Sequence, residues 1–161
     1  MEFLGIGVLN SVNYAEKVEK MVLSSWVKGN IDDGEDFNPW FDPDAVSTLR
    51  KIQEAYNFKI VISSTWRYHL TIDDFNKVFN TYYDWDTTGI IVGKTDTESG
   101  IRGVQIKRWL DNHGKFPYSY LIIDDSSDML ETQMPYLLHL NVEHGLRERD
   151  LVEVEEILGE P

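Results

Sequence analysis

Two polar segments that each follow a run of apolar residues carry the side chains best suited to chemistry. The first is Asp124-Asp125-Ser126-Ser127-Asp128, directly after the apolar run 120–123. Carboxylates packed this closely repel one another unless a cation joins them, and Mg²⁺ prefers carboxylate oxygens and water. The motif therefore predicts a Mg²⁺ site formed by Asp124, Asp125 and Asp128. The alternative is an acidic turn in which one Asp caps the next helix.

The second segment is Ser63-Ser64-Thr65-Trp66-Arg67, after the apolar run 58–62. Its hydroxyl and backbone N–H groups can donate hydrogen bonds to an oxyanion, and the Arg67 guanidinium can bind two phosphate oxygens. Ser63 and Arg67 are therefore candidates for an anion-binding corner. A polar turn with a packed Trp is the alternative interpretation.

A third set of candidates is cationic. Arg102-Gly103 precedes a helical pattern that also carries Lys107, and a cation near that helix start could neutralise a phosphate. Lys107 could equally be a solvated surface residue. The four His residues are scattered, without a pair at helical ligand spacing, so a zinc site is not expected.

The elements that must position these side chains alternate between strands and helices. Apolar runs predict strands at 3–9, 58–62, 90–92, 120–123 and 137–140, and helical spacing predicts helices at 14–27, 42–56, 71–79, 104–110 and 150–158. Asp42 before Pro43, and Thr71, are the expected caps of two helices. The alternation predicts an α/β fold with a doubly wound parallel sheet. Ligands of such sheets bind at the carboxyl ends of the strands, where the polar segments lie.

Bulk composition restricts the class of protein. A length of 161 residues without repeats or linkers predicts one domain over 1–161. The chain has no Cys, which suits a reducing cytoplasm. It has no apolar run of the length that a membrane span needs, so no span is expected. The net charge of −13 argues against tight non-specific binding to nucleic acid. That charge could provide solubility, or it could mark a partner-binding face, a cation site or a decoy that resembles nucleic acid.

The motifs, in their order along the chain, resemble a haloacid dehalogenase-like phosphatase. They are Gly7-Val8-Leu9-Asn10, Lys59 to Arg67, Arg102-Gly103 with Ile106 and Trp109-Leu110, and Ile122 to Met129. Within that superfamily the chain is most similar to the small domains linked to RNA repair, often found in phages and bacteria. The resemblance covers essentially the whole chain. It implies a Rossmannoid fold with a small cap or flap inserted after the first strand, at 11–40.

The resemblance also implies a reaction, the Mg²⁺-dependent hydrolysis of a phosphomonoester on a small molecule, a nucleotide or a nucleic-acid end. In that family an aspartate after the first strand accepts the phosphoryl group, and a second aspartate two residues later acts as general acid and base. By position, Ser63 would hydrogen-bond the phosphoryl group, and Arg102, or less well Lys107, would stabilise its charge. With Asp125, and with Arg67 from the anion-binding corner, these residues form the candidate catalytic set.

The first motif departs from the family pattern Asp-x-Asp-Gly-Val-Leu-Asn. Counting back from Gly7, Leu4 and Ile6 occupy the aspartate positions, and a one-residue deletion would place Gly5 at the nucleophile position. Neither alignment supplies the carboxylate that covalent catalysis needs. Either the protein is a pseudo-phosphatase that binds a nucleotide-like ligand or a protein partner, or this strand departs from that of a native phosphatase.

Overall fold

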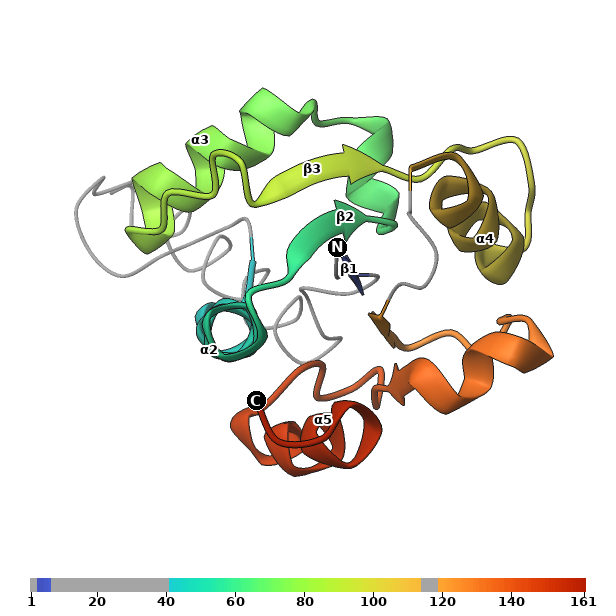
Figure 1. Ribbon diagram of the computed structural model, residues 1–161. Coiled ribbons are helices and arrows are strands. Elements are labelled where there is room, and N and C mark those ends of the chain that lie inside the picture. The colour runs from blue at the N-terminus through green and yellow to red at the C-terminus, as the bar shows by residue number, and fades with distance from the viewer. Residues whose placement is uncertain (1–2, 7–40, 114–118) are drawn as a thin grey trace, which may run out of the picture.

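A single parallel sheet organises the chain, and the computed structural model describes residues 3–6, 41–113 and 119–161 (Figure 1). The strands are β1 (Phe3–Ile6), β2 (Lys59–Ile62), β3 (Ile91–Lys94), β4 (Tyr120–Asp124) and β5 (Leu137–His139). Their order is β3-β2-β1-β4-β5, and every pairing is parallel. The described α-helices are α2 (Pro43–Tyr56), α3 (Ile72–Tyr83), α4 (Arg102–His113) and α5 (Leu151–Leu158). The predicted α/β class with a parallel sheet is confirmed.

The first strand lies at the centre of the sheet. β1 pairs with β2 on one side and with β4 on the other, so that Gly5 is in register with Val61 and Ile122. The order places β1 between the strands that carry the two polar motifs at their ends. The remainder of the predicted first strand, the helix predicted at 14–27 and the cap predicted at 11–40 lie outside the described residues.

Helices cover both faces of the sheet. Successive strand residues point to opposite faces: Ile60 and Ile62 belong to a core that also contains residues of α2, α3 and α5, whereas Val61 packs with α4. β4 alternates in the same way. In Figure 1, α4 lies on one side of the sheet and α2 and α3 lie on the other. The near-continuous apolar runs in β2 and β4 are typical of parallel strands that are buried on both faces.

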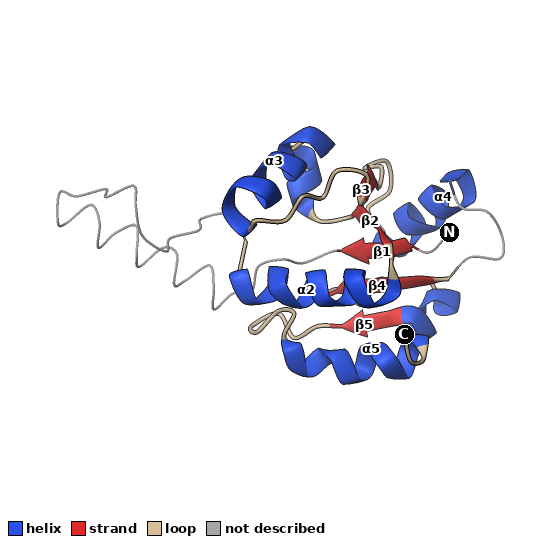
Figure 2. Cartoon of the chain, turned by 60° about the vertical axis from the view of Figure 1, so that its left-hand side comes forward, coloured by secondary structure: helices blue, strands red, loops and turns tan. Residues whose placement is uncertain are grey.

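The start of α2 is fixed by contacts from distant segments. The Asp42 carboxylate caps the helix by accepting from the N–H of Asp44, and it forms an ion pair with Arg147 at 2.7 Å. The hydroxyl of Tyr83 donates to the Phe41 carbonyl at 2.6 Å and accepts from the Phe41 N–H at 2.7 Å. These contacts hold Phe41 and Asp42 at the start of α2, the helix labelled in Figure 2. The predicted Asp cap is confirmed.

Several boundaries differ from the prediction. α3 begins after the Thr71 cap, as predicted, but continues to Tyr83 and ends at Asp84 in the left-handed conformation. Three 3₁₀ helices of the described residues were not predicted: η1 (Thr65–Tyr68), η2 (Glu131–Tyr136) and η3 (Glu148–Asp150). Such short segments do not show a hydrophobic period. Within the described residues, no helix is both long enough and apolar enough to cross a membrane.

Candidate functional site

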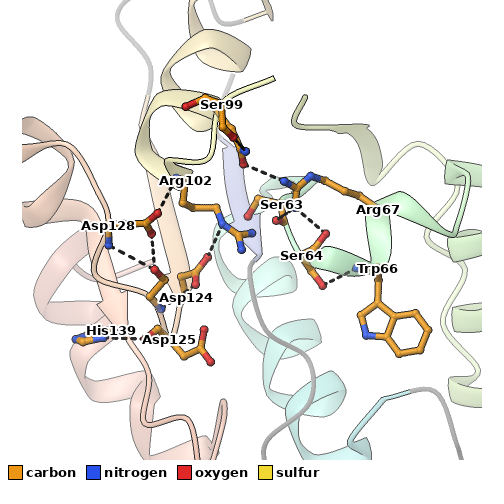
Figure 3. Close-up of polar contacts among 12 residues, drawn as sticks. Ser63, Ser64, Trp66, Arg67, Ser99, Arg102, Asp124, Asp125, Asp128 and His139 are labelled. Atoms are coloured by element: carbon orange, nitrogen blue, oxygen red, sulfur yellow. Dashed lines mark hydrogen bonds and ion pairs between the residues drawn. The ribbon is translucent and has the colours of Figure 1, made fainter. Parts of the chain in front are cut away.

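The candidate site lies at the carboxyl ends of β2 and β4, beside the start of α4. Ser63 follows β2, Asp124 ends β4, and Arg102 is the first residue of α4. Ser63 and Asp124 are completely buried. Figure 3 draws Ser63 between Arg67 on one side and Arg102 with Asp124 on the other. The parallel sheet thus brings to one edge three segments that are far apart in the sequence, as expected for such folds.

Asp124 is the buried carboxylate of the site. Its Oδ1 accepts from the Ser126 N–H at 2.9 Å, whereas its Oδ2 lies 3.7 Å from Arg102 Nε and has no hydrogen-bond partner among the described residues. Burial raises the pKa of Asp124; the charge of Arg102 and the Ser126 hydrogen bond only partly offset this, and the Asp125 carboxylate raises it further. Because a buried polar atom without a hydrogen bond is costly, Oδ2 is suited to receive a cation.

Arg102 faces Asp124 from the first turn of α4. Its side chain is 17% exposed, and its Nη1 is buried without a hydrogen-bond partner among the described residues. A guanidinium with an unsatisfied donor at this edge can bind an oxyanion. Lys107, the weaker candidate, lies one to two turns further along α4 on the exposed surface, where its ammonium pairs with Asp111. Of the two cations, only Arg102 contacts Asp124 within the described contacts.

Arg67 is buried, but the protein itself occupies its terminal nitrogens. Nη1 donates to the carbonyls of Ser63 and Ser64, and Nη2 donates to Gln105 Oε1 at 2.9 Å. Burial lowers the pKa of Arg67, and the nearby positive charge of Arg102 lowers it further. In this arrangement Arg67 holds the loop after β2 in place and adds positive potential to the site. Its Nη atoms already donate to acceptors of the protein.

The remaining acidic residues of the late motif do different things. Asp125 follows the buried carboxylate, and its backbone carbonyl contacts His139 Nε2 at 3.1 Å. Asp128 is exposed, and its carboxylate accepts from the N–H of Arg102 and from the Ser126 hydroxyl. The alternative interpretation of the sequence, in which an Asp of this motif caps a helix, therefore describes Asp128, although the helix it caps precedes it in the chain.

The residues that could hold a metal ion at this edge are carboxylates. Within residues 3–6, 41–113 and 119–161, no group of three or more His, Cys, Asp or Glu side chains could hold a metal ion. Mg²⁺ is commonly bound by one or two carboxylates, with water and substrate phosphate completing its shell. Asp124, with a buried oxygen that lacks a hydrogen bond, and Asp125 beside it meet that requirement.

The sequence did not identify the polar residues that support this site. Gln105 is almost fully buried on α4, where it joins Arg67 to the Ser99 carbonyl. Gln133 is buried in η2 and contacts the start of α4. For Gln105 a signal exists, because it stands next to Ile106 and four residues before Trp109 on the apolar stripe of a predicted helix. A polar residue on such a stripe needs a buried partner.

Residues 7–151 match the model of a protein family described as the HAD domain in Swiss Army Knife RNA repair proteins. The chain belongs to this family. No curated protein and no solved structure matches the chain. Membership in a haloacid dehalogenase-like (HAD) family associated with RNA repair confirms the resemblance noted in the sequence and supports a phosphohydrolase scaffold.

The family match begins at Gly7, immediately after the strand β1. The positions at which the aspartates of the first motif are missing, Leu4 to Ile6, thus lie outside the matched range, whereas Ser63, Arg102 and Asp124 lie inside it. The matched part of this HAD domain contains the buried acidic and basic pair of the site. The strand β1, from which a nucleophile would come, lies among the unmatched residues 1–6.

Proposed function

We propose that this chain binds a phosphomonoester, at the end of a nucleotide or nucleic-acid strand, together with Mg²⁺, and that it does not hydrolyse the ester at a measurable rate. The family description, which refers to RNA repair proteins, supports a phosphorylated nucleic-acid end as the ligand. The proposal treats 1–161 as one domain in the cytoplasm, with a doubly wound sheet and a cap or flap at 11–40. The helices packed on both faces of the sheet support the doubly wound arrangement.

One observation carries the proposal: two oppositely charged groups face each other at the strand ends without satisfying each other. Arg102 Nε and Asp124 Oδ2 are 3.7 Å apart, and Arg102 Nη1 and Asp124 Oδ2 each lack a hydrogen bond among the described residues. Buried polar atoms normally have partners. A phosphate oxygen on Arg102 and a cation on Asp124 would supply both missing partners at once.

Asp124 and Asp125 are the residues that would hold Mg²⁺, whose charge would offset that of the phosphate. Ser63 would donate to a phosphate oxygen, and Arg102 would neutralise the remaining charge. Arg67 would keep the loop that carries Ser63 in place through its bonds to the Ser63 and Ser64 carbonyls. This division of roles makes the site a receptor for a dianionic group.

The absence of hydrolysis follows from β1. Leu4, Gly5 and Ile6 bring no carboxylate, so an aspartyl-phosphate cannot form there. A second candidate function, Mg²⁺-dependent hydrolysis, is favoured by the retained arrangement of Arg102 and Asp124, which matches what a phosphatase of this family would need. The two candidates share the binding step and differ only in turnover.

A titration separates binding from turnover. Calorimetry would measure the affinity for 5′- and 3′-phosphorylated oligonucleotides and their unphosphorylated forms, with and without Mg²⁺, and p-nitrophenyl phosphate would report hydrolysis. We expect Mg²⁺-dependent binding of a phosphorylated end and turnover at background. Loss of a nucleophile from a cooperating catalytic set lowers the rate by about 10⁴-fold or more. Equal affinity for phosphorylated and unphosphorylated ends would refute the proposed ligand.

Restoring the first motif provides the matching gain-of-function test. One variant carries Leu4→Asp with Ile6→Asp, and another carries Gly5→Asp with an Asp inserted after Ile6, which recreates Asp-x-Asp-Gly. Turnover that appears in either variant and is lost again with Asp124→Asn would support the proposal that the chain keeps a phosphatase site and lacks only the nucleophile. Robust Mg²⁺-dependent turnover by the unaltered chain would instead establish the second candidate and imply another nucleophile.

A further inference from the structure

The first turn of α4 is held by a loop that comes later in the chain. The N–H of Arg102 donates to Asp128 Oδ2 at 3.0 Å, and the N–H of Gly103 donates to the Asp128 carbonyl at 3.0 Å. The first N–H groups of a helix have no partner within the helix and are usually capped by the residue just before it. Here a residue 26 positions later supplies that cap.

Gln133 strengthens the same junction. Its Nε2 donates to the Gly103 carbonyl at 2.8 Å, and its Oε1 accepts from the Leu130 N–H at 2.9 Å. The approach is so close that a Cβ on Gly103 would lie 2.5 Å from Gln133 Oε1 and 2.5 Å from the backbone nitrogen of Leu130. We refer to Gly103, Asp128 and Gln133 as the α4 clamp. It fixes the backbone from which the Arg102 side chain projects.

Both oxygens of the Asp128 carboxylate are engaged within the protein. Oδ2 accepts from the Arg102 N–H, and Oδ1 accepts from the Ser126 hydroxyl. The N–H of Ser126 in turn donates to Asp124 Oδ1. A continuous path of hydrogen bonds therefore runs from the buried carboxylate, through Ser126 and Asp128, to the backbone of the arginine that faces that carboxylate. Figure 3 labels Asp124, Asp128 and Arg102 along this path.

From this geometry we infer that Asp128 is a positioning residue for Arg102 rather than a metal ligand. It fixes the start of α4 in the position from which Arg102 Nε faces Asp124. The guanidinium is therefore already in place when a phosphate binds. The inference rests on the proposed function, because the expected effect of this positioning is a higher affinity for phosphate. It assigns to the late acidic motif two separate tasks: Asp124 and Asp125 face the ligand, and Asp128 holds the opposing cation.

The test is a double-mutant cycle on the full chain, with inorganic phosphate plus Mg²⁺ as the probe. We expect Asp128→Ala to weaken phosphate binding about fivefold, the equivalent of one lost helix cap. In an Arg102→Ala background the same change should alter affinity less than about twofold, because residues that act through one another are not additive. Asp128→Asn, which keeps an acceptor for the N–H, should restore near-wild-type affinity. Asp111→Ala, which removes a carboxylate further along α4, is the matched control and should not weaken binding.

A second measurement does not depend on ligand binding. The Arg102 Nε–Hε resonance in ¹H–¹⁵N spectra should shift or broaden in Asp128→Ala and stay in place in Asp111→Ala. If the unaltered chain binds no phosphate, the proposed function fails, while this resonance still decides whether Asp128 positions Arg102. Should Asp128→Ala fail to fold, Ser126→Ala removes only the support of Asp128 and should give a smaller shift and a smaller affinity loss. Additive losses in the cycle, or an Asp128→Asn variant that loses Mg²⁺ affinity, would overturn the inference.

Discussion

Arg67 and Gln105 meet through a buried hydrogen bond of 2.9 Å between Nη2 and Oε1, although 38 residues separate them. Arg67 is 6% exposed and Gln105 4% exposed. Gln105 also donates to the Ser99 carbonyl, so this one amide connects the loop after β2, the helix α4 and the segment that precedes it. The polar loop that carries Ser63 is therefore fixed against α4 independently of any ligand.

Gln105→Leu should destabilise the protein by about 1.5–3 kcal/mol, because a charged donor of Arg67 would stay buried without its acceptor. Urea denaturation, followed by circular dichroism, measures the change. Asn112→Leu, on the exposed part of the same helix, should change the free energy of unfolding by less than about 0.5 kcal/mol. A Gln105→Leu variant as stable as the unaltered chain would mean that Arg67 finds another acceptor.

We expect Gly103→Ala to have the opposite of its usual effect in a helix. Ala is favoured over Gly in a helix interior by about 1 kcal/mol. Here the added Cβ would meet Leu130 N at 2.5 Å and Met129 Cα at 2.8 Å, which are backbone atoms with little freedom to move. We expect a net destabilisation of about 1–3 kcal/mol from overpacking, measured as a shift of the thermal midpoint. Gly100→Ala is the control, since a Cβ there meets nothing within 4 Å.

Arg102→Ala should weaken phosphate binding about 10- to 100-fold, because hydrogen bonds to charged groups contribute about 1.5–3 kcal/mol. Lys107→Ala should change the affinity by less than about threefold, since its ammonium lies on the exposed face beside Asp111 and exposed ion pairs contribute little. Calorimetric titration of phosphate in the presence of Mg²⁺ compares the two variants. Equal losses would assign the phosphate to both cations and contradict the placement at Arg102.

The capping box of α3 gives a pH-dependent prediction. Hydrogen bonds from the backbone and the hydroxyl of Thr71 hold the pKa of the Asp74 carboxyl below its ordinary value of 3.8. A carboxyl with a lowered folded-state pKa stabilises the fold fully above its unfolded-state pKa, and this contribution is lost as the pH falls through the folded-state value. Asp74→Asn should therefore be less stable than the unaltered chain at pH 6. The difference should shrink below pH 3.8. Urea denaturation at several pH values measures this difference in stability. A difference that stays the same at every pH would show that the cap does not depend on the charge of Asp74.

Local pattern in the sequence determined the alternation of strands and helices and several of their ends. The buried strands β2 and β4 were predictable because their apolar runs are continuous. The starts of α2 and α3 were predictable because the capping hydrogen bonds of Asp42 and Thr71 reach residues within three positions along the chain. The sequence by itself also determined the family and the missing carboxylates of the first motif, since both depend only on residue types in order.

Only the tertiary structure decided which atoms each polar side chain meets. The sequence suggested Arg67 for the phosphate and Asp128 for the metal, whereas the fold directs Arg67 to the Ser63 and Ser64 carbonyls and Asp128 to the start of α4. These partners can be tens of residues away, and they are set by strand order and helix packing rather than by local spacing. A buried polar atom binds whichever partner the packed elements bring within about 3 Å, because leaving it unpaired is costly.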